Sequence, residues 1–198
     1  MRPEGASLPL LLASTSPARR ELLARLGIPF EAVAPDYEEA ACPGLSGPEL
    51  ALRHALGKAL SVAGRHPDRI AIGSDQAAEL DGELLGKPGT QEAAVAQLLR
   101  MSGRRIAFHT GLALVCGGRR ETAVETYWVR LRHLSPEQAA AYVARERPLG
   151  CAGSFKIEGL GISLMQALEG RDYTALIGLP LIALTELLGR FGVDVLAY

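Results

Sequence analysis

The chain has 198 residues, of which 48% are hydrophobic and 22% are charged, values typical of a soluble globular protein with one sizeable domain. Its formal net charge of −1 excludes the global basic field that nucleic-acid-binding and membrane-surface proteins use. Any positive charge that holds an anionic ligand must therefore be local.

The first third of the chain alternates strand and helix signals. Residues 9–13 are continuously apolar, as in a strand buried on both faces of a sheet. Ser16 and Pro17 predict the start of a helix, because a hydroxyl suits the N-cap and proline suits the first turn. Gly27 predicts the end of this helix. The following predicted elements are a strand at 30–34, a loop at 35–48 and a helix at 49–64.

The rest of the chain predicts further strands, two hairpins and three helices. Residues 69–74 form an apolar strand that ends at Asp75, and Asp81-Gly82 indicates a hairpin within 77–85. The other predicted elements are a helix at 90–102, a hairpin of strands 106–116 and 121–131, and helices at 135–146 and 181–191. This alternation favours an α/β fold with a mixed sheet, in a single domain over residues 1–198 without a separable linker.

The cysteines and the apolar runs bear on where the protein works. Cys42, Cys116 and Cys151 contain no CxxC pair, so neither a disulfide framework nor a zinc knuckle is expected, and a reducing cytoplasm fits best. The apolar run at 8–13 is too short for a signal sequence or a membrane span. The four histidines form no i, i+4 pair, which disfavours a histidine-based metal site. We expect a cytoplasmic protein without nucleic acid or membrane as a partner.

Three hydroxyls and two arginines surround the predicted start of the first helix. Ser14, Thr15 and Ser16 follow the buried strand, and Arg19 and Arg20 come at once after them. A helix N-terminus offers unpaired backbone N–H groups and the positive end of the helix dipole. Hydroxyl donors and a guanidinium added there make a phosphate site. The alternative is an ordinary capped helix with two solvated arginines.

Several charged residues later in the chain are weaker candidates when taken singly. Asp75 is expected at the C-terminal end of a strand, where open α/β sheets bind ligands, so it can ligate a divalent cation or orient a water molecule. Its alternative role is to cap the following turn. Lys58 and Lys87 are surface lysines by default, and Glu38-Glu39 is a solvated pair by default. The Walker A spacing is absent around Lys87.

Taken in order along the chain, these segments form one pattern. The segments are S-T-S-P-A-R-R at 14–20, Glu39, Lys58, Ser74-Asp75-Gln76, Gly86-Lys87-Pro88, Thr110-Gly111, Ala152-Gly153 and Gly178-Leu179-Pro180. From about Leu10 to Gly192 the chain resembles the Maf family of nucleotide pyrophosphatases. The resemblance implies an elongated, mixed and twisted sheet with flanking helices and two lobes around a cleft, as in the inosine triphosphate pyrophosphatases.

The resemblance also implies an activity and a role for each matching residue. The activity is hydrolysis of a nucleoside triphosphate to the monophosphate and pyrophosphate, with a divalent metal cation, Mg²⁺ or Mn²⁺, as cofactor. Asp75 is then the expected general base and a metal contact, and Glu39 is the expected second metal contact. The residues expected to hold the triphosphate are Ser14, Arg19, Lys58 and Lys87.

Three residues bear on the choice of nucleotide. Gln76 and Glu158 match the branch of the family similar to 7-methyl-GTP pyrophosphatase, whereas Ala18 departs from the Trp that this branch often carries. The dTTP/UTP branch typically has Arg, Thr and Gln where this chain has Ala18, Gln76 and Glu158. The expected small-molecule substrate is therefore 7-methyl-GTP. The alternatives are a dTTP/UTP pyrophosphatase and a catalytically silent regulator of septum formation, and a homodimer is left open.

Overall fold

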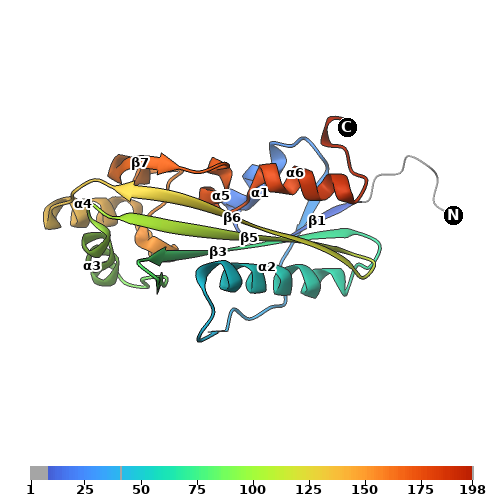
Figure 1. Ribbon diagram of the computed structural model, residues 1–198, viewed down its shortest axis with the longest axis horizontal. Coiled ribbons are helices and arrows are strands. Elements are labelled where there is room, and N and C mark those ends of the chain that lie inside the picture. The colour runs from blue at the N-terminus through green and yellow to red at the C-terminus, as the bar shows by residue number, and fades with distance from the viewer. Residues whose placement is uncertain (1–8, 41, 198) are drawn as a thin grey trace.

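The computed structural model describes residues 9–40 and 42–197 and has an elongated shape (Figure 1). A single seven-stranded sheet runs through it in the order β2-β1-β3-β5-β6-β7, with β4 paired to β3. Its strands are β1 (Leu10–Ala13), β2 (Phe30–Val33), β3 (Ile70–Leu80), β4 (Glu83–Leu85), β5 (Arg105–Cys116), β6 (Arg119–Leu131) and β7 (Met165–Glu169). β1 pairs in parallel with β2 and β3, and the other pairs are antiparallel. The expected mixed sheet is confirmed.

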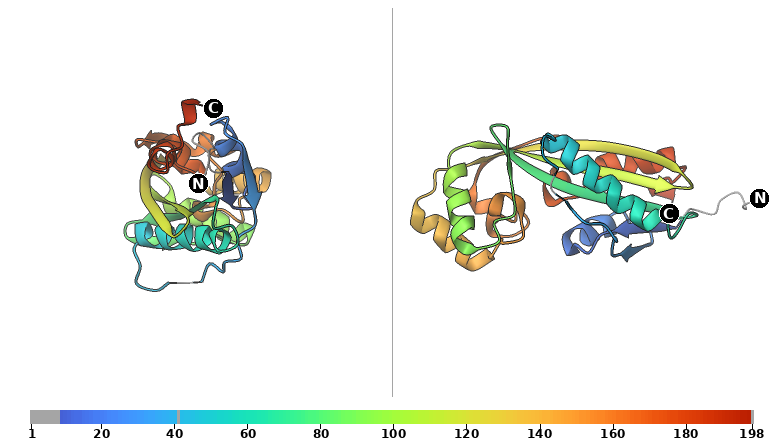
Figure 2. Two further views of the ribbon diagram at one scale, coloured as in Figure 1. Left: turned by 90° about the vertical axis from the view of Figure 1, so that its right-hand side faces the viewer. Right: turned by 90° about the horizontal axis from the view of Figure 1, so that it is seen from below.

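Helices flank this sheet on both faces (Figure 2). They are α1 (Pro17–Ala24), α2 (Gly47–Ala63), α3 (Gln91–Met101), α4 (Pro136–Glu146), α5 (Tyr173–Ile177) and α6 (Leu181–Arg190), with short 3-10 turns at Ala152–Ser154, Leu160–Leu164 and Val195–Ala197. α2 lies along one face, and α1 and α6 lie on the opposite face (Figure 1). The alternation of side chains in β1 explains this arrangement, because Leu10 and Leu12 pack towards α1 and α6 while Leu11 packs towards α2.

The two ends of the sheet carry separate hydrophobic cores, which make two lobes. The first lobe holds the apolar clusters just described. The second lobe forms where the far ends of β3, β5 and β6 pack against α3 and α4, with Leu80, Ile106 and Val129 buried against Leu98 and Val143. The long antiparallel strands pass from one lobe into the other, so the sheet itself connects them.

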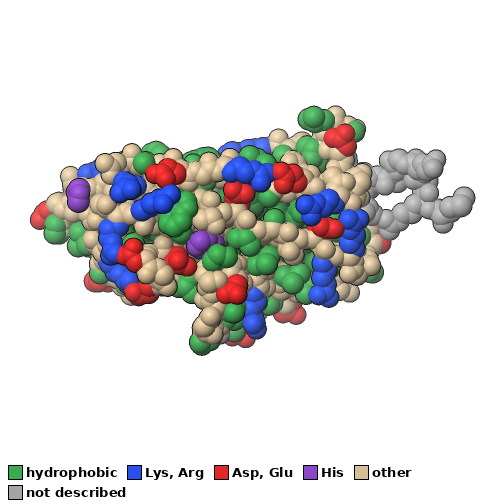
Figure 3. Space-filling view, viewed as in Figure 1, with side chains coloured by type: hydrophobic (Ala, Val, Ile, Leu, Met, Phe, Trp, Pro, Cys, Tyr) green, Lys and Arg blue, Asp and Glu red, His purple; other side chains and the backbone are tan. Residues whose placement is uncertain are grey.

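Figure 3 shows acidic and basic side chains side by side on one face of the molecule.

The strand that carries Asp75 differs from its prediction. We expected it to end at Asp75, but β3 continues to Leu80 and places Asp75 at its middle. The prediction was wrong because β5 pairs with β3 from Ala71 to Glu79 and keeps the strand extended. On the other side of β3, β1 pairs only as far as Ile72 and β4 begins at Ala78. No strand of the described chain pairs with residues 73–77 on that side, so the sheet edge is open beside Asp75.

Two glycines allow α2 to lie unusually close to the sheet. A Cβ atom at Gly73 would lie 2.1 Å from the carbonyl oxygen of Ala55, and one at Gly111 would lie 2.4 Å from that of Ala51. Any larger residue would push the helix away from β3 and β5. Asp75 is paired with Gly111 and lies two residues beyond Gly73, so its side chain is on the same face as the helix. This close approach brings α2 within reach of Asp75.

Most other predicted elements are confirmed, with differences at their ends. α2 begins at Gly47 rather than Glu49, because the N–H of Ser46 donates to Glu49 Oε2 at 2.9 Å and closes a capping box. The hairpin at Asp81-Gly82 and the one at Gly117-Gly118 both form, with positive φ at these turn residues. β7 and α5 were not predicted, since both are short segments in the glycine-rich last third of the chain.

Candidate active site

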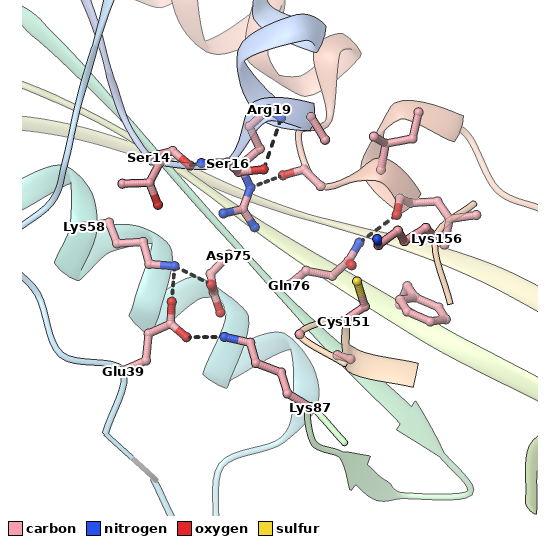
Figure 4. A pocket seen from close by; sticks show the side chains of 18 of the residues that line it. Ser14, Ser16, Arg19, Glu39, Lys58, Asp75, Gln76, Lys87, Cys151 and Lys156 are labelled. Atoms are coloured by element: carbon pink, nitrogen blue, oxygen red, sulfur yellow. Dashed lines mark hydrogen bonds and ion pairs between the residues drawn. The ribbon is translucent and has the colours of Figure 1, made fainter. Parts of the chain in front are cut away.

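A cleft of about 580 Å³ lies between the two lobes (Figure 4). The first lobe contributes the end of β1, the start of α1, the loop before α2, and Lys58 and Asp75. The second lobe contributes Lys87 and residues 150–152 and 155–158. The volume of the cleft is in the range of sites that enclose small organic ligands. The basic residues of the lining are Arg19, Lys58, Lys87 and Lys156, and the acidic ones are Glu39, Asp75 and Glu158.

Four predicted site residues form one chain of ion pairs across the cleft. Lys58 Nζ lies 2.6 Å from Asp75 Oδ1 and 2.5 Å from Glu39 Oε1. Glu39 Oε2 in turn accepts from Lys87 Nζ at 3.0 Å. Lys58 and Asp75 are buried, whereas the Lys87 side chain is 61% exposed. Figure 4 shows the four side chains converging from the loop before α2, from α2, from β3 and from the segment after β4.

This chain of ion pairs keeps Glu39 ionised. Partial burial acts to raise the pKa of the Glu39 carboxyl, but the hydrogen bonds and charges of Lys58 and Lys87 outweigh it and lower the pKa to about 2. The Glu39 carboxyl group is therefore ionised at neutral pH. Each of its oxygens faces an ammonium group, so the loop before α2 is tied to both lobes.

Arg19 is aimed at the cleft by a residue far away in the chain. Its Nε donates to the carbonyl oxygen of Gly178 at 2.8 Å, and the same oxygen accepts from Ser74 Oγ at 2.9 Å. Because Nε is held, the two Nη groups form the free end of the guanidinium, and Figure 4 shows that end pointing into the cleft. Burial lowers the pKa of Arg19, and the charges of Asp75 and Glu39 act against that shift. The guanidinium remains protonated under all ordinary conditions.

The hydroxyls before α1 divide into structural and cleft-facing groups. Ser16 caps the helix, accepting from the N–H of Arg19 at 3.4 Å. Ser14 is buried on the cleft lining, where its Oγ accepts from the N–H of Ser16 at 3.1 Å and keeps its own hydrogen for a ligand. Arg20 is exposed and lies outside the lining, so of the two predicted arginines the structure brings only Arg19 to the cleft.

The three predicted specificity residues all line the cleft. Gln76 Nε2 donates to Ala175 O at 2.9 Å and to Leu176 O at 3.1 Å, which joins β3 to α5. Nε2 also lies 3.1 Å from Thr110 Oγ1. The two carbonyl oxygens can only accept, so they fix which end of the amide carries the nitrogen, and Oε1 is the end left for a ligand. Glu158 is exposed at the lining, and Ala18 lies in the first turn of α1.

The cleft also contains residues that sequence reasoning did not select. Lys156 Nζ donates to the carbonyl oxygen of Glu146 at 3.1 Å, at the end of α4, and its position two residues before Glu158 was the available signal. Tyr37 lines the cleft from the loop before α2. Cys151 lies opposite Gln76 in Figure 4, and burial raises the pKa of its thiol. A thiol with a raised pKa stays protonated and is a poor nucleophile.

Two carboxylates of the cleft are candidate ligands for a divalent cation. Within residues 9–40 and 42–197, no cluster of three or more His, Cys, Asp or Glu side chains is suited to metal binding. Mg²⁺, however, is commonly held by one or two protein carboxylates and completes its shell with water and substrate phosphate oxygens. Glu39 and Asp75 are two such carboxylates, joined to the same lysine, and they fit a cation that arrives with a phosphate ligand.

With this geometry in place, comparison with known proteins identifies the family. The chain matches the model of the family described as Maf-like protein over residues 9–191. It belongs to the Maf-like family. The match includes every residue of the predicted site, from Ser14 to Glu158, and confirms the resemblance seen in the sequence.

Individual Maf-like relatives are similar to this chain over nearly its whole length. The 7-methyl-GTP pyrophosphatase of Pseudomonas aeruginosa is 50% identical over 188 residues, covering 94% of this chain and 98% of that protein. The 7-methyl-GTP pyrophosphatase of Syntrophotalea carbinolica is 51% identical over 191 residues, covering 94% and 96%. Among solved structures, the Ham1 protein of Staphylococcus aureus is similar with a TM-score of 0.46 and 17% identity over 62% of this chain and 71% of that chain. No helix of the described residues is long and apolar enough to cross a membrane.

Proposed function

We propose that this Maf-like protein is a nucleoside triphosphate pyrophosphatase that hydrolyses 7-methyl-GTP to 7-methyl-GMP and pyrophosphate. The observation that carries the proposal is the buried contact of Lys58 with Asp75 and Glu39, opposite Arg19, in a cleft of about 580 Å³. Basic groups that bind phosphate and carboxylates that serve water and a cation are both needed for this reaction. The relatives named 7-methyl-GTP pyrophosphatase, about half identical to this chain, support the same substrate.

The triphosphate would lie along the basic groups of the cleft. Arg19 offers a free guanidinium end for two phosphate oxygens, and Lys58 and Lys87 offer point charges. Ser14 and the N-terminus of α1 add hydrogen-bond donors at the same end. Lys58 and Lys87 are paired with carboxylates in the free protein, so they are held ready at the positions where phosphate charge must be neutralised.

In the proposed chemical step, Asp75 acts as the general base. A water molecule attacks the α-phosphorus, and one of its protons passes to the Asp75 carboxylate while the new P–O bond forms. The bond between the α-phosphorus and the bridging oxygen breaks, and its electron pair leaves with pyrophosphate. Arg19, Lys58 and Lys87 stabilise the negative charge that grows on this leaving group. Asp75 is suited to the base role because it is buried beside the open edge of β3.

A divalent cation, Mg²⁺ or Mn²⁺, is the proposed cofactor, and Glu39 and Asp75 would hold it together with phosphate oxygens. Such a cation supplies charge neutralisation and polarisation of the phosphate when it is bound. In the free protein the Lys58 ammonium neutralises both carboxylates. Lys58 would therefore move from the carboxylates towards the phosphates as the substrate binds, which keeps the charges of the cleft balanced throughout.

Selection of the nucleobase would depend on hydrogen-bond acceptors. Guanine presents donors at N1–H and at its exocyclic amine, and the cleft offers Gln76 Oε1 and the Glu158 carboxylate as acceptors. The negative charge of Glu158 also favours the positive charge of a 7-methylated base. Ala18 leaves room where the related branch often carries Trp, so the methylated ring would lack a stacking partner from α1. We infer a cytoplasmic setting for the enzyme, since all three cysteines are free.

A substrate panel tests the proposal directly. The purified protein would be incubated with Mg²⁺ and with 7-methyl-GTP, GTP, dTTP or UTP, and pyrophosphate release would be measured. We expect 7-methyl-GTP to have the highest kcat/KM. Faster hydrolysis of dTTP and UTP would assign the chain to the other branch instead. Absence of turnover with every nucleotide would leave the silent regulator as the explanation and would overturn the enzyme assignment.

A further inference from the structure

Glu39 reaches the cleft from the segment that follows β2 (Figure 1). The described residues 34–40 of this segment have no helix or strand of their own. Within the described residues 35–40, the side chains that form hydrogen bonds or ion pairs with other elements belong to Tyr37 and Glu39. The position of the Glu39 carboxylate therefore depends on how this short segment is attached. Tyr37 is the second point of attachment.

The side chain of Tyr37 packs against α2 at His54 and Gly57. Its hydroxyl oxygen is 2.9 Å from His54 Nδ1, and its ring meets the imidazole edge-on, with centroids 5.8 Å apart and an interplanar angle of 65°. The ring lies directly over Gly57. A Cβ atom at that position would be 2.1 Å from Tyr37 Cε2, far closer than two carbon atoms can approach. Glycine is thus required at position 57 for the ring to lie where it does.

The contact between Tyr37 and α2 lies beside the ion pair of Glu39 with Lys58. His54, Gly57 and Lys58 are related by i, i+3 and i+4, so they share one face of α2. Tyr37 and Glu39 are two residues apart, and both side chains contact this face of α2. The loop is therefore fixed to one helix face at two adjacent points, by Tyr37 on Gly57 and by Glu39 on Lys58.

We propose that Tyr37, packed against Gly57 and His54, is the positioning residue that holds Glu39 in the cleft and thereby sets the affinity of the site for its divalent cation. The inference rests on the proposed function, in which Glu39 is a metal contact. Tyr37 also lies on the cleft lining, so direct contact with the nucleotide is the rival role. The two roles predict different changes, because the first acts on the cation and the second acts on the nucleotide.

Metal and nucleotide dependence separate these roles. The Mg²⁺ concentration that gives half-maximal hydrolysis, and the nucleotide KM at saturating Mg²⁺, would be measured for the wild type, Tyr37→Ala and Gly57→Ala. We expect the half-maximal Mg²⁺ concentration to rise about tenfold in both variants, as is typical when a residue that orients a metal ligand is lost, and KM to change less than about twofold. A raised KM with unchanged Mg²⁺ dependence would overturn the proposal.

A matched glycine on the same helix provides the control. Gly64→Ala makes the same chemical change at the end of α2, where the nearest neighbour of the new Cβ is Leu60 O at 3.4 Å. This variant should keep the wild-type Mg²⁺ dependence. The double variant Tyr37→Ala/Gly57→Ala should be no worse than Tyr37→Ala alone, because the ring that clashes is gone. A further loss in the double variant would show that Gly57 acts in another way and would overturn the proposal.

A binding measurement keeps the inference separable from the proposed function. Mn²⁺ would be titrated into the wild type and Tyr37→Ala in the presence of inorganic triphosphate, with free Mn²⁺ followed by electron paramagnetic resonance. We expect binding about tenfold weaker in the variant. A wild type that binds Mn²⁺ but hydrolyses no nucleotide would end the proposed function while leaving the positioning role intact. Equal affinity in the two proteins, or no binding to the wild type, would end the positioning role.

Discussion

Lys58 Nζ lies 2.6 Å from Asp75 Oδ1 at a place where both side chains are buried. The same ammonium group contacts Glu39, so one buried cation stands between two carboxylates. Removing that cation would leave buried negative charges without compensation, which costs far more than an exposed ion pair contributes. The pair is therefore needed for stability as well as for the proposed chemistry.

Lys58→Met should lower the free energy of unfolding by about 3 kcal/mol, because Asp75 then lacks its buried partner. The measurement is urea unfolding at neutral pH. Arg100→Met is the matched control, since it breaks an exposed ion pair with Glu83 and should change stability by less than about 1 kcal/mol. Equal losses in the two variants would contradict a special role for the buried pair.

Asp75→Asn should lower kcat by about 10³-fold, because an amide cannot take the proton from the attacking water. Nucleotide binding should survive, since Arg19 and Lys87 have no direct contact with Asp75 and Lys58 keeps its ammonium charge in the variant. Pyrophosphate release gives kcat, and titration calorimetry gives the nucleotide affinity. A variant with near wild-type turnover would show that another group serves as the base.

The contribution of Glu39 to stability should depend on pH. Its pKa falls from 4.5 to about 2 in the folded protein, so its stabilising effect is complete above about pH 4.5 and is lost as the pH falls towards 2. The difference in unfolding free energy between the wild type and Glu39→Gln should be constant from pH 5 to 7 and shrink below that range. Because the side chain is 36% exposed, we expect the difference to be less than about 1 kcal/mol. A difference of the same size at pH 3 and pH 7 would contradict this account.

Gly111→Ala should displace α2 from the sheet, because its Cβ would lie 2.4 Å from the backbone oxygen of Ala51. We expect a loss of about 1–3 kcal/mol in stability and a lower kcat, since Lys58 would move away from Asp75. Gly189→Ala on α6 is the control, because a Cβ there meets nothing within 4 Å. Thermal unfolding and turnover would be measured for both variants. Only Gly111→Ala should lose stability and turnover, whereas Gly189→Ala should keep wild-type turnover and gain up to about 1 kcal/mol from the higher helix propensity of alanine.

Glu158→Gln should alter the order of substrates more than the rate with the best one. Loss of a charged acceptor from the base site should reduce the preference for 7-methyl-GTP over dTTP about tenfold in kcat/KM. The phosphate-binding groups are unaffected, so kcat with the preferred nucleotide should stay close to that of the wild type. An unchanged substrate preference would place the nucleobase elsewhere in the cleft.

Local chemistry in the sequence was sufficient to predict most elements of the fold. Ser16-Pro17 and Ser135-Pro136 start helices through caps that involve neighbouring residues only. Asp81-Gly82 and Gly117-Gly118 form hairpins because their backbones adopt positive φ. In the same way, the order of short motifs along the chain identified the family before any contact between them was known.

The geometry of the site was decided by contacts between distant parts of the chain. Whether Asp75 ended a strand or stood at its middle depended on β5, which pairs with β3 through residues more than 25 positions away. The direction of Arg19 depends on Gly178, and the place of Glu39 depends on Lys58 and Lys87. The sequence by itself thus determined the family and most of the elements that carry the candidate site residues. Only the tertiary structure determined how they face one another, because those interactions join segments that local patterns do not relate.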